Sequence, residues 1–176
     1  MNFRKGFAVQ LRAIDKKIYR NHLRKTTFAA IFSLLCGSLI LSTVLIHFIG
    51  NDTQSNFNLN LASIIVTIVL MLITLLNIKQ QPFFTEMYYV WRVKFELSHI
   101  NRKMIAVENA AKNDNHLALN ILAYYYQATE QVWLLDDNTV AMEEFVIKGN
   151  KVKKWMTDAN HTPDVTVYNR VDLQQF

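Results

Sequence analysis

The sequence predicts an all-α membrane protein: a two-helix transmembrane hairpin, followed by a cytoplasmic antiparallel helical hairpin and a short C-terminal helix. Three observations lead to this fold class. Two long blocks, residues 26–49 and 59–78, contain no Asp, Glu, Lys or Arg. Basic residues gather on the flanks that lead into the first block and out of the second. Apolar residues after the second block recur at helical spacing.

The two uncharged blocks are long enough to be membrane spans. They hold 24 and 20 residues, and a hydrocarbon core about 30 Å thick needs about 20 residues of helix. Two buried core helices are the alternative, but a chain of 176 residues has too little other material to wrap both. A cleaved signal peptide is disfavoured, because its apolar stretch has only about 7–15 residues. The single cysteine, Cys36, lies within the first block and excludes an intramolecular disulfide.

The distribution of charge predicts the orientation. Residues 1–25 carry eight basic residues against Asp15 alone, whereas the loop 50–58 has no Lys or Arg. Short flanks rich in Lys and Arg stay in the cytoplasm, so both termini are expected there. The chain is thus divided into a basic segment (1–25), a first span (26–49), an external loop (50–58), a second span (59–78), a cytoplasmic helical domain (79–158) and a flexible tail (159–176).

The N-terminal segment predicts a basic amphipathic helix. Phe3, Phe7, Leu11, Ile14 and Ile18 recur at spacings of three and four residues. Such a helix beside a span is typical of one lying on anionic membrane lipids; docking onto the acidic cytoplasmic domain remains the alternative. An aromatic belt with basic neighbours follows the second span and is typical of an interface. The candidate lipid-surface residues are Arg12, Lys16, Lys17, Arg20, Arg24, Lys25, Trp91 and Arg92.

Small and hydroxylated residues predict helix packing inside the membrane. Ala29, Ser33 and Gly37 follow one another at intervals of four, which allows helix backbones to approach closely. The second span carries a mildly polar face with Ser63, Thr67, Thr74 and Asn77. The two faces are expected to pack within one hairpin, or to join copies of the chain in a homo-oligomer.

The cytoplasmic domain is predicted to be a helical hairpin. Seven apolar residues from Val90 to Ala111 alternate spacings of three and four, which predicts one helix to about Lys112 with a packing seam. Residues 113–115 form a turn and an N-cap, and a second helix runs from about Asn115 to Leu135. A short basic helix closes the domain. Its inner and seam residues are Val90, Val93, Leu97, Ile100, Met104, Val107, Ala111, Leu117, Ile121, Tyr124, Ala128, Val132 and Leu135.

The sequence offers no catalytic constellation. With four glycines there is neither a phosphate loop nor a dinucleotide fingerprint, and no cofactor is expected. Glu96 and His99 form one Glu-x-x-His, but di-iron bundles need it on two helices with two further Glu residues; we interpret it as chance spacing on a solvated helix. Nucleic-acid binding is not expected, because topology accounts for the excess basic charge. The candidate partner surface is Tyr125, Leu135, Asp136 and Asp137.

Several stretches together resemble an uncharacterised family of small bacterial inner-membrane proteins, known as a domain of unknown function. The likeness covers roughly Ile14 to Phe145 and excludes the tail. It implies a Gram-negative inner membrane and two spans, and it supplies no catalytic residues. The matching stretches are Ile14-Asp15-Lys16, Tyr19-Arg20-Asn21-His22-Leu23, Tyr89-Val90-Trp91-Arg92-Val93-Lys94, Tyr125-Tyr126-Gln127 and Leu135-Asp136-Asp137-Asn138-Thr139.

These patterns favour a non-enzymatic inner-membrane adaptor or assembly factor, whose cytoplasmic hairpin binds a protein partner. The alternative is a protein that binds anionic lipid or organises the membrane through the basic N-terminal helix and the aromatic belt.

Overall fold

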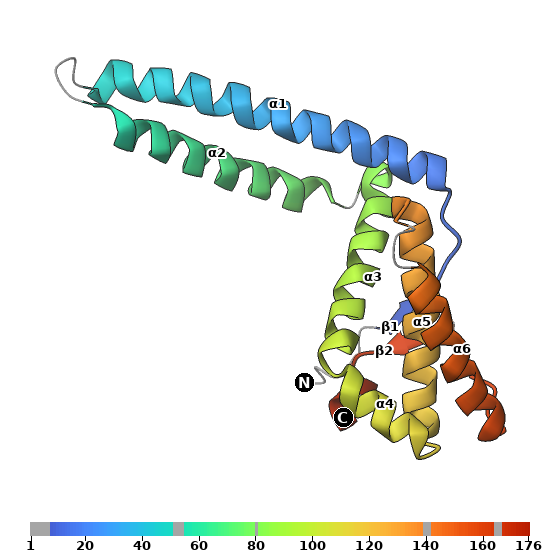
Figure 1. The fold of residues 1–176 in the computed structure, drawn as a ribbon. Coiled ribbons are helices and arrows are strands. Elements are labelled where there is room, and N and C mark those ends of the chain that lie inside the picture. The colour runs from blue at the N-terminus through green and yellow to red at the C-terminus, as the bar shows by residue number, and fades with distance from the viewer. Residues whose placement is uncertain (1–7, 51–54, 80, 139–141, 164–166) are drawn as a thin grey trace, which may run out of the picture. The chain divides into compact units, whose positions relative to one another are not determined.

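The structure is a computed structural model that describes residues 8–50, 55–79, 81–138, 142–163 and 167–176. These residues form two compact units. One unit is residues 17–88, and the other combines residues 89–176 with the N-terminal residues up to Lys16. Six α-helices and a two-stranded sheet lie within the described residues (Figure 1).

The unit of residues 17–88 is dominated by two long helices, α1 (Lys16–Ile49) and α2 (Phe57–Ile78). Both are long and apolar enough to cross a membrane. In the most apolar 18-residue stretch, no residue of α1 and only 11% of the residues of α2 are buried. This exposure differs from that of a soluble core helix, whose apolar residues are covered by protein. The short 3-10 turn Pro82–Phe84 then leads into α3 (Thr85–Arg102).

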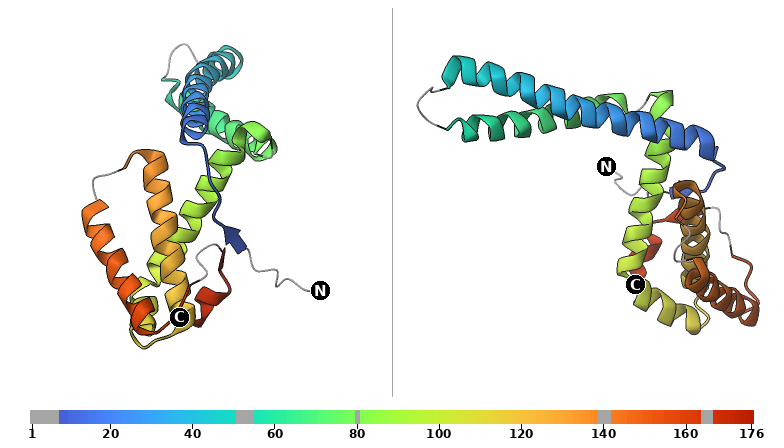
Figure 2. Two further views of the ribbon diagram at one scale, coloured as in Figure 1. Left: turned by 90° about the vertical axis from the view of Figure 1, so that its right-hand side faces the viewer. Right: turned by 45° about the horizontal axis from the view of Figure 1, so that its top comes forward.

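The other unit is built around α5 (His116–Asp136), which contributes ten buried residues to the core. It is packed by α4 (Met104–Lys112) and α6 (Met142–Asp158), and Figure 2 shows α6 lying along α5. The predicted start of α5 is confirmed, since the Asn115 side chain accepts a hydrogen bond from the Ala118 amide at 3.0 Å. Asp137 follows the helix in the left-handed conformation, with φ of 57°.

The prediction of one continuous helix from residue 90 to about 112 is wrong. The chain leaves helical geometry at Lys103, so that α3 and α4 are separate helices pointing in different directions (Figure 1). The seam residues on both sides stay buried, with Ile100 and Val107 each 0% exposed. The spacing of the apolar residues does not reveal the break. A single non-helical residue changes the direction of the helix axis, but it leaves the intervals of three and four residues in the sequence unchanged. The Lys103 ammonium donates to the Leu173 carbonyl at 3.1 Å.

The expected N-terminal amphipathic helix is also wrong from residue 8 to residue 15. Strand β1 (Ala8–Gln10) pairs antiparallel with β2 (Val167–Asn169), with Val9 opposite Tyr168. Helix α1 begins only at Lys16, so Leu11 and Ile14 share no helical face with Ile18. Phe3 and Phe7 lie outside the described residues. The segment forms a strand because it pairs with β2 near the other end of the chain. The local spacing of apolar residues cannot predict a partner so distant in sequence.

The tail that we expected to be flexible is ordered in its described residues. Besides forming β2, it ends in a 3-10 helix, Asp172–Gln175, and it buries Tyr168 and Leu173 to 2% and 4% exposure. The Tyr168 ring stacks on Tyr124 with centroids 5.0 Å apart. The tail therefore completes the core around α5. The described residues are mainly helical, as predicted, with one short two-stranded sheet besides the helices.

Candidate functional site

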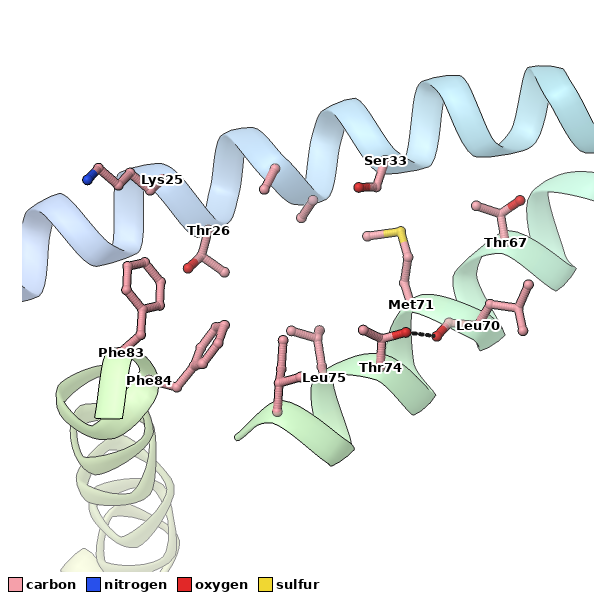
Figure 3. Close-up of a pocket in the computed structure, with 13 residues that line it drawn as sticks. Lys25, Thr26, Ser33, Thr67, Leu70, Met71, Thr74, Leu75, Phe83 and Phe84 are labelled. Carbon is pink, nitrogen blue, oxygen red and sulfur yellow. Dashed lines mark hydrogen bonds between the residues drawn. The ribbon is translucent and has the colours of Figure 1, made fainter. Parts of the chain in front are cut away.

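Two hollows are the candidate sites, one in each unit. The first is a cavity of about 430 Å³ between α1 and α2 (Figure 3). The second is a groove of about 460 Å³ between α5 and α6. Both volumes fall in the range of about 300–1,000 Å³ that is usual for ligand sites.

The α1–α2 cavity exists because the two helices touch at one level and separate at another. At Gly37 the approach is so close that an added Cβ would lie 3.0 Å from the Thr67 methyl carbon. The Ser42 hydroxyl also donates to the Asn60 side-chain oxygen. From this contact toward Lys25 the α1 side carries only small residues, Ala29, Ala30 and Ser33, which leave space facing α2.

The structure divides the six predicted helix-packing residues into two groups. Gly37, Ser63 and Thr67 lie at the contact, where Ser63 is 0% and Thr67 7% exposed. Ala29, Ser33 and Thr74 line the cavity instead, and Thr67 borders it as well. Within the described part of the chain, the hydroxyls of the predicted polar face of α2 donate no hydrogen bond to α1. The Ser63, Thr67 and Thr74 hydroxyls donate to carbonyls four residues earlier, at 2.7–2.9 Å.

The mouth of the cavity is polar and aromatic. Thr26 from α1 faces Phe83 and Phe84, and Lys25 lies at the same end of the lining with its side chain extending outward along α1 (Figure 3). The Thr26 hydroxyl oxygen is buried and has no hydrogen-bond partner among the described residues. Beside it, the His22 ring packs on Phe83 with centroids 4.1 Å apart, and His22 Nδ1 lies 3.5 Å from a Glu86 carboxylate oxygen.

The α5–α6 groove is mainly apolar. Tyr126 and Phe145 form one wall, with ring centroids 4.9 Å apart. Gly149 opens the groove, since an added Cβ would only touch the Tyr126 ring at 3.4 Å. Partial burial raises the pKa of Tyr126 to about 12, which keeps its phenol protonated. Val146, also in the lining, is 49% exposed, and the neighbouring Ile147 is 70% exposed. Lys153 contributes a positive charge to the lining and Glu130 a negative one.

The predicted partner surface is wrong at Leu135, which is a core residue with 5% exposure. Its polar neighbours form ion pairs: Asp136 with Lys94 at 2.6 Å, and Asp137 with Lys16. Tyr125 is half-buried, with its hydroxyl 3.5 Å from the Asn101 side-chain oxygen. The periodicity of the sequence could not predict the groove, because the groove forms where α6 packs against α5.

The predicted lipid-surface residues are divided as well. Arg12 is exposed, but it contacts its own unit, with its guanidinium 4.4 Å from the centre of the Tyr89 ring. Its backbone N–H donates to the Tyr89 hydroxyl, and its carbonyl accepts from Gln131. Trp91 is 60% exposed and stacks on Phe95 at 5.7 Å, while Arg92 is half-buried. The remaining basic residues, Lys16, Lys17, Arg20, Arg24 and Lys25, belong to α1.

In the Glu96–His99 pair, the Glu96 carboxylate has a structural role. Glu96 is 2% exposed, so the prediction of a solvated position is wrong, and Arg170 binds it through two hydrogen bonds of 3.0 and 2.5 Å. Among the described residues, no three His, Cys, Asp or Glu side chains are grouped to hold a metal ion. The two hollows have the volume of ligand sites, and among the described residues neither is lined by a nucleophile paired with a base.

A family model described as "Protein of unknown function (DUF3087)" matches residues 9–173. The match extends past the stretch of resemblance noted in the sequence and includes the tail. No curated protein and no solved structure matches the chain.

Proposed function

The chain belongs to the DUF3087 family, and we propose that it is a non-enzymatic adaptor or assembly factor of the bacterial inner membrane. In this proposal α1 and α2 form a transmembrane hairpin and both termini are cytoplasmic. The unit of residues 89–176 then binds a protein partner in the α5–α6 groove.

Membrane insertion is supported by the surface of α1 and α2. Large apolar side chains are exposed along their whole length, for example Phe32 at 69%, Leu39 at 67% and Leu76 at 63%. Apolar area costs about 25 cal/mol per Å² in water, so such a surface needs lipid or another protein around it. The basic flank on α1 and the loop without Lys or Arg support the orientation.

The observation that carries the adaptor role is the α5–α6 groove. Its apolar lining, which includes the 49% exposed Val146, is typical of a surface that another protein covers. Of the four lysines of helix α6, Lys148, Lys151, Lys153 and Lys154, Lys153 is the one that lines the groove. We propose an amphipathic segment of the partner as the occupant, with its apolar side chains in the groove and a carboxylate on Lys153.

The test is site-specific photo-crosslinking in the native membrane. A photoreactive residue at Val146, in the groove lining, is expected to cross-link one protein at fixed stoichiometry. The same residue at Ile105, which is 78% exposed on α4, is the control and is expected to give none. The Gly149→Leu variant fills the groove, and Lys153→Glu reverses the charge of that side chain; both should abolish the product at residue 146. Equal products at residues 105 and 146, or a product that survives both variants, would contradict the proposal.

The second candidate function, binding of anionic lipid, is favoured by a different observation. Trp91 is 60% exposed, and Lys25 stands at the mouth of the α1–α2 cavity. Lipid binding through an amphipathic helix over residues 8–15 is excluded, because strand β1 begins this segment and α1 starts only at Lys16. Neutralising Lys17 and Arg20 together should reduce flotation with phosphatidylglycerol vesicles at low salt if this function holds.

A further inference from the structure

We infer that the α1–α2 cavity is a binding site for one anionic phospholipid of the cytoplasmic leaflet. An acyl chain lies between the helices, and the phosphate lies on Lys25. The inference rests on the proposed membrane insertion and orientation, and it is independent of the adaptor role.

The dimensions of the cavity match one leaflet. Its α1 lining runs from Lys25 to Ser33, eight residues along the helix, which corresponds to about 12 Å at 1.5 Å per residue. Half of a hydrocarbon core is about 15 Å. The Gly37–Thr67 contact closes the helix pair beyond the deep end. A chain entering at the level of Lys25 therefore reaches the end of the cavity near the middle of the bilayer.

The lining is suited to an acyl chain. The walls between the helices are mainly apolar, with Ala29, Ala30, Leu70, Met71 and Leu75. Ser33 and Thr67 lie toward the deep end, and the hydroxyls of Thr67 and Thr74 are already bonded to the Ser63 and Leu70 carbonyls. Figure 3 shows Met71 extending from α2 into the space between the helices. Water in this space would find few polar partners, whereas hydrocarbon fills it without loss of hydrogen bonds.

The mouth is suited to an anionic headgroup. Lys25 is exposed and has no acidic partner within the described part of the chain, so its ammonium is available to a phosphate. One residue further along, the buried Thr26 hydroxyl lacks a hydrogen-bond partner among the residues that the structure describes. Glycerol ester or phosphate oxygens at this level would accept its hydrogen bond, which would remove the cost of a buried unpaired hydroxyl. Phe83 and Phe84 complete the mouth at the depth where aromatic side chains meet headgroups.

A helix from a second copy fits less well than a lipid. One turn of helix, taken as a cylinder about 10 Å across and 5.4 Å long, occupies about 420 Å³. The cavity of about 430 Å³ thus holds about one turn, while packing along its length would require two or more. A flexible chain can fill the same volume without spreading α1 from α2.

The experiment uses the full chain, delipidated in mild detergent and titrated with phosphatidylglycerol or phosphatidylcholine under native mass spectrometry. Wild-type protein is expected to retain one phosphatidylglycerol at collision energies that remove all phosphatidylcholine. Lys25→Ala should reduce phosphatidylglycerol occupancy about tenfold, whereas Lys79→Ala, outside the lining, should leave it unchanged. Ala29→Phe fills the cavity and should abolish retention. Thr27→Phe adds the same ring at a position that does not line it and should not.

Several outcomes would overturn the inference. These are equal retention of both lipids, equal effects of Lys25→Ala and Lys79→Ala, or full retention by Ala29→Phe. A dimer that Ala29→Phe dissociates, with no retained lipid, would assign the cavity to a second copy. Alkaline extraction of the membranes separates this failure from that of the proposed function. Protein washed out by alkali refutes membrane insertion itself, whereas protein that stays with the lipid and retains no phosphatidylglycerol refutes only the site.

Discussion

Arg170, in the C-terminal tail, binds the buried carboxylate of Glu96 on α3 through two hydrogen bonds, Nε to Oε2 at 3.0 Å and Nη2 to Oε1 at 2.5 Å. The guanidinium also lies 5.2 Å from the centre of the Phe95 ring. Glu96 is 2% and Arg170 35% exposed at the side chain. This bidentate pair raises the pKa of Arg170 and joins the tail to the helix that leads out of the α1–α2 unit.

Replacing Arg170 by Met should destabilise the unit of residues 89–176 by about 3 kcal/mol. This is the lower end of the range for breaking a buried ion pair, because the partly exposed site lets water reach Glu96. The double variant Glu96→Met, Arg170→Met should recover most of the loss, since no unpaired charge remains. Urea unfolding of the full chain in detergent, followed by circular dichroism, measures both. Arg102→Met, at an exposed position, is the control. A double variant no more stable than Arg170→Met would refute the argument.

Two buried tyrosines should respond oppositely to loss of the hydroxyl. The Tyr89 hydroxyl donates to Gln131 and accepts from the Arg12 amide, both at 3.1 Å. Tyr89→Phe should therefore cost about 1 kcal/mol. The Tyr124 hydroxyl is buried with no partner among the described residues, so Tyr124→Phe should be neutral or slightly stabilising. The same unfolding measurement compares the two, and a larger loss for Tyr124→Phe would contradict the described hydrogen bonds.

Enlarging Gly37 should loosen the α1–α2 contact. The new Cβ in Gly37→Ala would meet the Thr67 Cγ2 atom at 3.0 Å, and overpacking of this kind costs about 1–3 kcal/mol. Thr67→Ser removes that methyl group and keeps the hydroxyl bonded to the Ser63 carbonyl. The double variant should thus regain the stability that Gly37→Ala loses. Loss of helicity during titration with sodium dodecyl sulfate is the measurement, and absence of rescue would locate the clash elsewhere.

Acid should weaken the junction between the tail and α5. The His161 ring stacks on His116 with centroids 4.4 Å apart, and its Nε2 lies 2.8 Å from the Asn120 side-chain oxygen. Desolvation, and then the neighbouring His116, lower the pKa of His161. A lowered pKa favours the neutral ring, so this stability is fully present above the unfolded value of about 6.5. It is lost as the pH falls through the folded value.

The measurement is an NMR titration of the His161 ring together with unfolding at pH 7 and pH 5. In His116→Asn the pKa of His161 should move upward, and the loss of stability between pH 7 and pH 5 should shrink. An unchanged pKa in this variant would show that His116 does not act on His161.

The local elements could be predicted from the sequence. The two long apolar helices, the course of α5 and its Asn115 cap depend on helical periodicity, capping and the length of uncharged stretches. Each is set by neighbouring residues and by whether the surroundings are water or hydrocarbon. The small residues of α1 also indicated where α1 and α2 approach, and Gly37 lies at that contact. Ala29 and Ser33 share the same periodicity, but they line the cavity.

Tertiary structure alone decided the rest. Val9 lies opposite Tyr168, and Glu96 binds Arg170, across separations in the chain that local spacing cannot register. The break at Lys103 leaves the apolar spacing intact while it turns the helix, and the groove at Gly149 depends on where α6 lies against α5. The sequence by itself determined the two long apolar helices, α5 and the surfaces that avoid water, because these depend on local composition and spacing. Which residues meet, and where the spaces between them remain, depended on the packing of the whole chain.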